Sequence, residues 1–286
     1  MVATTVGAVT VAELVKRLEA GVAEVTTSDG WRAYLAAQAK FHSYSLGNVL
    51  LILAQMPTAT RVCGFHGWLH LGRHVKKGEH GIRILAPMTV RRAEAGSADR
   101  EDEPQAVTRF RIVTVFDISQ TDGDPLPMHP AQTLTTDSER GAWLYARLLD
   151  LARAEGVSVR TAEDIRGSAN GAYLPSAHAI ILAPRLSVDQ RAKTLCHEFA
   201  HALLHRQTGK PRAEQEAEAE GTAFVVCCWA ALNTAQYTFA YIADWAHRED
   251  AAALVRKTGS TIQRTAAKII AALDPAAEAG NTRETA

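Results

Sequence analysis

Apolar positions in the first part of the chain recur with a helical period. A spacing of about 3.6 residues connects the apolar positions from Val11 to Leu18, and it returns from Trp31 to Ala39. Ser45 is a suitable N-cap for a third helix, which Pro57 must end because proline cannot continue a helix. The pattern therefore predicts three helices before Pro57.

The pattern then changes to segments typical of β-strands. Ile82–Leu85 and Phe110–Ile118 are rich in β-branched and aromatic residues, and they predict two strands joined by a charged loop from Ala93 to Gln105. The next segment, Gln120 to Pro130, holds three prolines and a glycine. This composition favours a linker, and we place a domain boundary there.

The second half predicts one helix, a hairpin and then more helices. A helix through Trp143 and Leu151 should end at Gly156, where glycine suits the C-terminal cap. The hairpin strands are expected at Gly171–Leu174 and His178–Leu182. The remaining helices are expected from a capping box at Ser187–Gln190 through His205, from about Ala213 to Ala231, and through Trp245 to Ile270.

Together these elements predict an α+β chain of two domains. Residues 8–125 form a helical and β-hairpin domain, residues 126–136 a linker, and residues 137–274 a mainly helical domain with a small β-sheet. A length of 286 residues suits two domains, each able to bury its own core. Residues 275–286 are small and polar, which predicts a disordered tail.

Composition limits the cellular compartments and the classes of binding partner that we expect for this chain. The longest apolar run, Val49–Ala54, is too short to span a membrane, and the N-terminus lacks the pattern of a signal peptide. Four cysteines without C-x-x-C spacing favour free thiols over a disulfide framework or a cysteine zinc site. We therefore expect a cytoplasmic protein. The 31 basic and 31 acidic residues give a net charge of +0, which excludes a uniformly basic protein but not a local basic patch.

The most specific motif is His197-Glu198-Phe-Ala-His201, within the helix that Ser187 begins. Residues four apart lie on one helix face, so His197 and His201 can reach a single metal ion. Glu198 lies beside them, where it can take a proton from the attacking water. The motif predicts a catalytic zinc with three protein ligands and one open position, and manganese or another divalent ion is an alternative.

The spacing leaves the third ligand open among the acids of the next helix. Glu214, Glu216, Glu218 and Glu220 alternate there, and most of them are expected to be solvated acids at a helix start. Glu218 and Glu220 are the better candidates because they lie where the helix becomes apolar. His205 extends the face of His201, but a fourth protein ligand would close the catalytic position. We therefore interpret His205 as a packing or supporting residue.

A second candidate site lies in the N-terminal half. Residues 61–92 carry a net charge of +6, with aromatic side chains inside and before this stretch. Cations that contact phosphates and rings that stack on bases are the mixture that single-stranded nucleic acid requires. The alternative is a solvated charged hairpin with its aromatic residues in the core. The candidate contacts are Trp31, Tyr44, Asn48, Arg61, Trp68, Arg73, Lys76, Lys77 and Arg83.

Four segments of the N-terminal half resemble ArdC-type antirestriction proteins. They are Tyr44-Ser-Leu-Gly-Asn48-Val-Leu-Leu-Ile, Gln55-Met-Pro-Thr-Ala-Thr-Arg61-Val, Gly67-Trp68-Leu-His-Leu-Gly-Arg73-His-Val-Lys76-Lys77-Gly-Glu-His-Gly-Ile-Arg83-Ile and Val115-Phe-Asp-Ile-Ser-Gln-Thr-Asp-Gly. The second half is similar to that family's zincin-like metallopeptidase domain and to ImmA/IrrE peptidases, whose glutamate ligand precedes an alanine in a Glu-Ala-x-x-x-Ala helix. That pattern falls on Glu218, which the resemblance implies as the third ligand. Gly221 departs from the family, which more often has a larger residue there.

The resemblance also implies a function. The N-terminal domain would bind single-stranded DNA, and the whole protein, encoded on a plasmid or other mobile element, would shield incoming DNA from host restriction. The C-terminal domain would be a zinc-dependent peptidase that cuts an unidentified protein substrate. Two alternatives remain: a regulatory metalloprotease that cleaves a repressor or restriction subunit, and a DNA-binding protein with a vestigial metal site.

Overall fold

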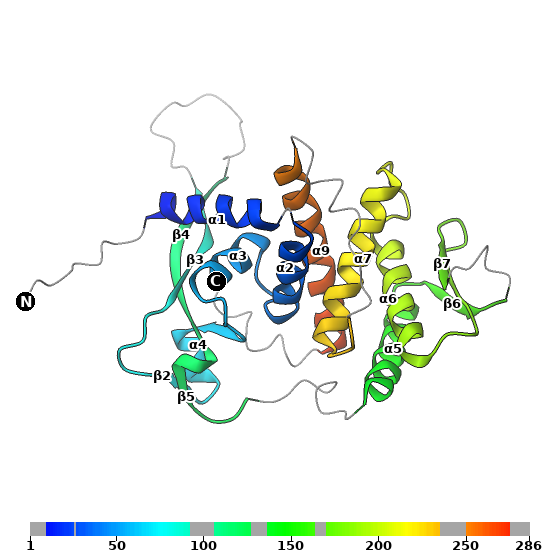
Figure 1. Cartoon of the computed structure of the whole chain (residues 1–286), viewed down its shortest axis with the longest axis horizontal. Coiled ribbons are helices and arrows are strands. Elements are labelled where there is room, and N and C mark those ends of the chain that lie inside the picture. Colours follow the sequence, from blue (N-terminus) through cyan, green and yellow to red (C-terminus); the bar gives the residue numbers. More distant parts are fainter. Residues whose placement is uncertain are drawn as a thin grey trace, which may run out of the picture.

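The structure is a computed structural model, and it describes residues 10–25, 27–91, 106–126, 136–163, 170–234 and 250–274 (Figure 1). The charged loop expected at Ala93–Gln105, the helical segment at Trp245, nearly all of the expected linker and the expected tail lie outside these residues. Helices together with small antiparallel and mixed sheets make this an α+β fold, as the sequence predicts.

The three helices expected before residue 57 are present as α1 (Val11–Val25), α2 (Ser28–Lys40) and α3 (Leu46–Gln55). Thr27 caps α2 by accepting a hydrogen bond from the backbone N–H of Gly30. Ser45 caps α3 in the same way, with the N–H of Asn48 as donor. Side-chain oxygens satisfy backbone donors that a helix start leaves unpaired, which explains why the chain begins helices at these residues.

An antiparallel sheet follows α3, with the strand order β1-β4-β3. Its strands are β1 (Val62–Gly64), β3 (Ile82–Arg91) and β4 (Ala106–Asp117). The side-chain amide of Asn48 pairs with the backbone of Leu85 on β3, with N···O distances of 2.9 and 3.0 Å. Gln55 pairs with the backbone of Arg83 in the same way. Two side chains of α3 thus pair with backbone N–H and C=O groups at the outer edge of β3.

A short helix and a small ribbon complete the N-terminal half. Helix α4 (Phe65–His70) follows β1, and β2 (Arg73–Val75) pairs with β5 (Thr121–Gly123). Between β4 and β5 lies the 3₁₀ turn η1 (Ile118–Gln120), which Asp117 caps. The Asp117 carboxylate also accepts the backbone N–H groups of Thr60 and Arg61, at 2.7 and 3.0 Å. These hydrogen bonds outweigh burial and lower the pKa of Asp117.

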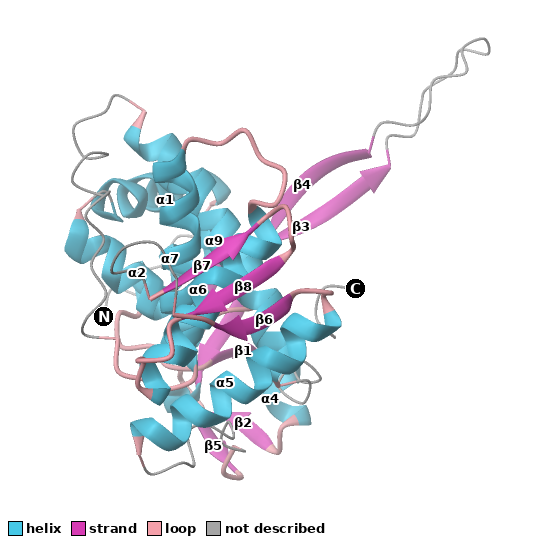
Figure 2. Cartoon of the chain, turned by 90° about the vertical axis from the view of Figure 1, so that its right-hand side faces the viewer, coloured by secondary structure: helices cyan, strands magenta, loops and turns pink. Residues whose placement is uncertain are grey.

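The C-terminal half begins with α5 (Asp137–Ala154) and a sheet of strand order β6-β8-β7. The expected hairpin is present as β7 (Gly171–Leu174) and β8 (Ala179–Leu182). Strand β6 (Ser158–Thr161), which the sequence analysis did not predict, pairs in parallel with β8. Figure 2 shows the three strands side by side, with β7 at the edge of the sheet.

Three further helices carry and support the site. They are α6 (Val188–Leu204), α7 (Arg212–Trp229) and α9 (Ala251–Leu273). Ser187 caps α6 by accepting the N–H of Gln190. Gly221 lies inside the continuous helix α7, where an added Cβ would come within 2.3 Å of Ile262 on α9. The absence of a side chain at Gly221 therefore lets the two helices approach closely.

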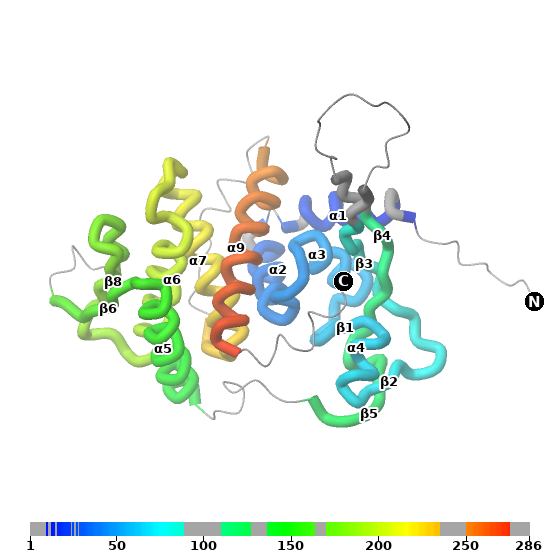
Figure 3. The backbone as a smooth tube through the Cα atoms, turned by 180° about the vertical axis from the view of Figure 1, so that it is seen from behind, coloured from blue at the N-terminus to red at the C-terminus, as the bar shows by residue number. Residues whose placement is uncertain are grey.

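The two halves share one continuous cluster of buried apolar side chains instead of holding separate cores. Helix α2 packs on α7, and α9 lies against α1, α3 and α7, as Figures 1 and 3 show. Trp31 of α2 is fully buried, and Gly259 of α9 approaches both its ring and Leu46. The sequence analysis expected a core in each domain. The apolar faces of α2 and α9 instead cover each other. Within the described residues, every helix is too short or too polar to cross a membrane.

Candidate metal centre

Helix α6 presents the two histidines of the motif to one another. His197 and His201 lie one turn apart, and their Nε2 atoms are 3.2 Å from each other. Both side chains are partly exposed, so they border the surface of the helix pair α6–α7 and not its interior. This is the arrangement that a helical spacing of four residues predicts.

Glu216 of α7 completes a three-residue cluster with these histidines. Its Oε2 atom lies 3.4 Å from Nε2 of His197 and 3.5 Å from Nε2 of His201. Ligand atoms about 2.0–2.1 Å from a tetrahedral zinc ion are separated from one another by about 3.3 Å. The three distances in the structure, 3.2, 3.4 and 3.5 Å, are close to these edges, so the three residues fit a divalent metal ion.

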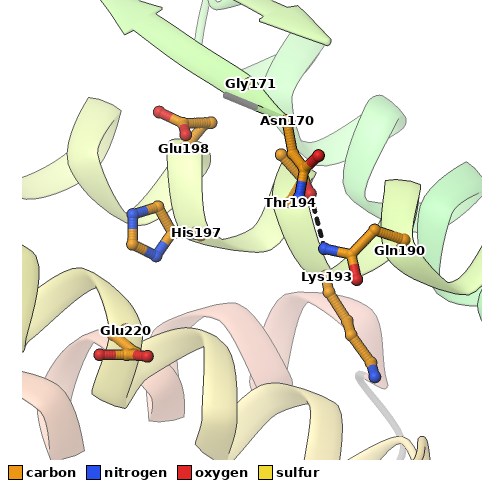
Figure 4. Close-up of a pocket in the computed structure, with 8 residues that line it drawn as sticks. All are labelled: Asn170, Gly171, Gln190, Lys193, Thr194, His197, Glu198 and Glu220. Atoms are coloured by element: carbon orange, nitrogen blue, oxygen red, sulfur yellow. Dashed lines mark hydrogen bonds between the residues drawn. The ribbon is translucent and has the colours of Figure 1, made fainter. Parts of the chain in front are cut away.

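The structure does not bring Glu218 to the two histidines, although the sequence analysis expected it there. Glu218 is fully buried, and its carboxylate contacts His205 and Lys210. The reason is helical geometry, because Glu218 lies about 200° around α7 from Glu216. Glu220 lies one turn after Glu216, on the same side, and it borders the pocket next to His197 (Figure 4).

Residue Glu198 lies on the opposite side of the histidines, next to β7. Its Oε2 atom accepts the backbone N–H of Tyr173, at 2.8 Å, and the side chain is nearly buried. Burial raises the pKa of Glu198, and the nearby histidines only partly oppose this effect. A carboxyl group with a raised pKa, fixed in position by a backbone donor, is suited to accept and return a proton.

Two adjoining pockets extend from this cluster. One runs between Asn170, Gln190, Lys193 and Glu220, and the other runs past Tyr173, Arg212 and Gln215; both are lined by Gly171, His197 and Glu198. An added Cβ at Gly171 would come within 2.6 Å of Thr194 on α6, so the glycine lets β7 lie close to the helix. The result is a groove that follows the edge strand across the histidines.

The charges of the cluster are strongly coupled. The contacts with His197 and His201 keep the pKa of Glu216 far below its usual value despite burial. Burial lowers the pKa of His197, but the carboxylates around it outweigh this effect and raise the pKa overall. Burial raises the pKa of Glu220 to about 7, with a further contribution from the charge of Glu216. Of the two acids on this side of α7, Glu216 thus has the lower pKa.

In the N-terminal half, four of the nine candidate DNA contacts belong to the framework of the fold. Trp31 and Trp68 are both fully buried, and the indole N–H of Trp68 donates to the carbonyl of Phe116 at 2.9 Å. The hydroxyl of Tyr44 donates to the carbonyl of Val62, and Asn48 holds β3. The two indole rings are thus inside the core, and the Tyr44 hydroxyl and the Asn48 amide have partners within the protein.

The candidate cations divide into two groups. Arg73 holds the β2–β5 ribbon through hydrogen bonds to Thr121, Gly123 and Asp124. Lys76 donates to the carbonyl of Ser119 and lies 3.6 Å from Asp122. The remaining three candidates, which are partly or fully exposed, are Arg61, Lys77 and Arg83.

The exposed aromatic side chains are ones that the sequence analysis did not select. Phe110 is 54% exposed and Phe65 is 46% exposed. A strand alternates its faces, and Phe110 is in phase with Ile112 and Thr114 and out of phase with the buried Val115. The alternation along β4 could therefore have identified Phe110 as outward-facing.

Two family models match the chain over separate ranges. Residues 6–116 match the N-terminal domain of anti-restriction factor ArdC. Residues 152–248 match the IrrE N-terminal-like domain of a peptidase family. The two ranges correspond to the two halves of the fold described above.

Similar proteins are found among curated sequences and among solved structures. An uncharacterized protein of Bacillus anthracis is 26% identical over 272 residues, which is 82% of this chain and 46% of that protein. This chain thus spans about half the length of that relative. The Mn(II)-bound crystal structure of antirestriction protein ArdC from plasmid R388 has a TM-score of 0.51 and 20% identity, covering 90% of this chain and 97% of that one. The metal-free structure of the same protein has a TM-score of 0.49.

Proposed function

The chain joins an ArdC-type N-terminal domain to an IrrE-like peptidase-family domain, and from this premise we propose that it is an antirestriction protein with a metal-dependent peptidase centre. Its N-terminal half would bind single-stranded DNA that enters the cell and shield it from restriction. Its C-terminal half would cut a protein substrate.

The metal ligands in this proposal are His197, His201 and Glu216. The observation that carries it is the near-tetrahedral spacing of their three ligand atoms, next to a buried carboxyl group at Glu198. Two imidazoles and one carboxylate are a common ligand set of catalytic zinc. The Mn(II) in the similar plasmid protein supports a divalent ion, and a set of this kind also accepts manganese.

The groove and its acid suggest how a peptide would be cut. When bound, the ion would polarise the peptide carbonyl and make water more acidic. Glu198 would accept a proton from the attacking water and then deliver it to the leaving amine nitrogen. The backbone N–H of Tyr173 would hold Glu198 in place for both transfers. An extended peptide would lie along the free edge of β7, which Gly171 allows to lie close to α6.

We expect Glu216→Gln to weaken metal binding at least about 100-fold, because one of three protein ligands is lost. Titrations of the full chain with Zn²⁺ and with Mn²⁺ against a fluorescent chelator measure the affinity. Glu220→Gln is the matched control, since Glu220 borders the same pocket one turn away and should change the affinity by less than about 3-fold. If the Glu216 variant bound Zn²⁺ and Mn²⁺ with wild-type affinity, Glu216 would not be a metal ligand.

For DNA, we propose that the outward face of the β3–β4 pair is the contact surface. In the ladder, Phe110 is opposite Pro87, Ile112 opposite Leu85, and Thr114 opposite Arg83, so these pairs share one face. The other face carries the buried Ile82, Ile84 and Val115. Leu85 and Ile112, in the middle of this face, pack partly against the core. On either side of them the face carries an exposed ring at Phe110 and a partly exposed side chain at Arg83, which suits stacked bases and a phosphate.

Phe110→Ala should weaken binding of a fluorescein-labelled oligothymidine by about 5- to 100-fold, the loss expected for one stacked base. Met88→Ala is the control, because Met88 is an exposed apolar side chain of the same strand pair but is out of phase with Phe110. Fluorescence anisotropy over a salt series gives both affinities and the number of phosphate contacts. Equal effects of the two substitutions would argue against this face.

A further inference from the structure

A continuous chain of hydrogen bonds leads from a buried carboxylate on α7 to the candidate metal centre. Oε2 of Glu218 lies 2.9 Å from Nε2 of His205, and Nδ1 of His205 lies 2.9 Å from Nδ1 of His201. The other ring nitrogen of His201, Nε2, is the atom that faces His197 and Glu216. Each of the two histidine rings thus uses both of its nitrogens.

The inner end of this chain of hydrogen bonds is fixed by charge. Glu218 is 0% exposed, and its second oxygen, Oε1, accepts a hydrogen bond from Nζ of Lys210 at 2.5 Å. Both oxygens of Glu218 have a partner, and the ammonium group of Lys210 balances the charge of the carboxylate. An ionised carboxylate only accepts hydrogen bonds, and an ammonium group only donates them. The direction of both contacts of Glu218 is therefore determined.

The acceptor role of Glu218 then determines which nitrogen donates in each of the two histidine rings. Because Glu218 only accepts, Nε2 of His205 must carry a proton. A neutral imidazole has one donor and one acceptor, so Nδ1 of His205 accepts, and Nδ1 of His201 must be the donor. This assignment leaves Nε2 of His201 without a proton, with its lone pair directed at the candidate metal position. The opposite assignment would place a proton on the nitrogen that must bind the ion.

We propose that Glu218 and His205 are positioning residues that fix the tautomer and the ring orientation of His201 for metal binding. The proposal rests on His201 being a metal ligand, as argued above. It also accounts for the pairing of the fully buried Glu218 with the partly exposed Lys210, since a buried charge is costly unless its hydrogen bonds are satisfied. His205, which is 6% exposed and follows the last residue of α6, connects the pair to the ligand.

The first test measures the tautomers directly in the metal-free full chain. Two-bond ¹H–¹⁵N spectra of the histidine-labelled protein distinguish the two ring nitrogens. We expect a neutral His205 with its proton on Nε2, and a proton on Nδ1 of His201. A His205 ring protonated at Nδ1, alone or together with Nε2, would overturn the proposal. This readout does not depend on metal binding or on activity, so it stands even if the proposed peptidase function fails.

The second test uses Glu218→Gln, whose amide has a predictable orientation. Lys210 only donates, so it should retain the carbonyl oxygen of Gln and turn the NH₂ group toward His205. That contact reverses the hydrogen bonds of both rings and should lower the affinity for Zn²⁺ by about 10- to 100-fold, as for other partners of metal-bound histidines. Glu214→Gln is the matched control. Glu214 lies on α7, as Glu218 does, and pairs with Lys210 and with Lys257 of α9, but not with His205.

A double-mutant cycle separates this role from a merely structural one. His205→Asn keeps an oxygen that can accept from Nδ1 of His201 but no longer relays the change at residue 218. We expect this variant to bind Zn²⁺ within about 10-fold of wild type, and His205→Phe to bind more weakly. In the His205→Asn background, Glu218→Gln should cost less than about 2-fold. Additive losses in the cycle would show that Glu218 acts independently of His205 and would overturn the proposal.

Discussion

We expect Glu198→Gln to slow peptide hydrolysis by about 10²- to 10⁴-fold while metal binding stays within about 3-fold of wild type. Glutamine fills the same space and can still meet the N–H of Tyr173 through its carbonyl oxygen. It cannot accept a proton from water or return one to the leaving amine. The loss therefore falls on the chemical step and not on the assembly of the site.

The measurement is cleavage of a mixed peptide pool by the Zn²⁺-loaded full chain, followed by mass spectrometry. Glu220→Gln, which changes the facing wall of the same pocket, is the control and should retain most of the activity. Hydrolysis at the wild-type rate in the Glu198 variant would exclude Glu198 as the proton carrier.

The same variant separates the biological alternatives. Unchanged protection of incoming DNA would favour a DNA-binding role, and lost protection would favour a required proteolytic step.

The second large effect concerns stability. Trp31→Ala should lower the free energy of unfolding by about 3–5 kcal/mol, as is usual when a fully buried tryptophan is truncated. The indole lies where α2 meets Gly259 of α9, so its removal opens a cavity between the two halves of the chain. Urea denaturation at equilibrium measures the change.

Phe65→Ala provides the control, because Phe65 is a large aromatic residue of the same half that is about half exposed. It should change the free energy of unfolding by less than about 0.5–1 kcal/mol. If Trp31→Ala instead left stability unchanged and removed DNA binding, Trp31 would be a stacking side chain and not part of the core.

Local signals in the sequence identified most of the framework. Ser45 and Ser187 begin helices where their side chains can cap them, and the histidine spacing places the two Nε2 atoms 3.2 Å from each other. The hairpin at Gly171–Leu182 also lies where alternation and turn residues predict it. These features depend on interactions between residues that are close in the sequence, so they can be predicted from the sequence alone.

The sequence signals failed where the answer depended on packing between distant segments. The change to apolar residues on α7 favoured Glu218 and Glu220, and the family resemblance then implied Glu218. The cluster with His197 and His201 instead contains Glu216, on the more exposed side of the helix. In the N-terminal half, aromatic type suggested DNA contacts, but Trp31 and Trp68 fill the core. Strand β6 was missed because its pairing with β8 is parallel and its residues are mostly exposed.

The shared core has a consequence for the order in which the chain can fold during synthesis. Residues 251–273 are the last described helix to leave the ribosome, yet α9 covers apolar side chains of α1 and α3 that were made more than two hundred residues earlier. Until α9 emerges, the N-terminal helices keep an apolar face exposed to water and open to chaperones. The nascent chain therefore completes its N-terminal half only after the metal-centre helices have been synthesised.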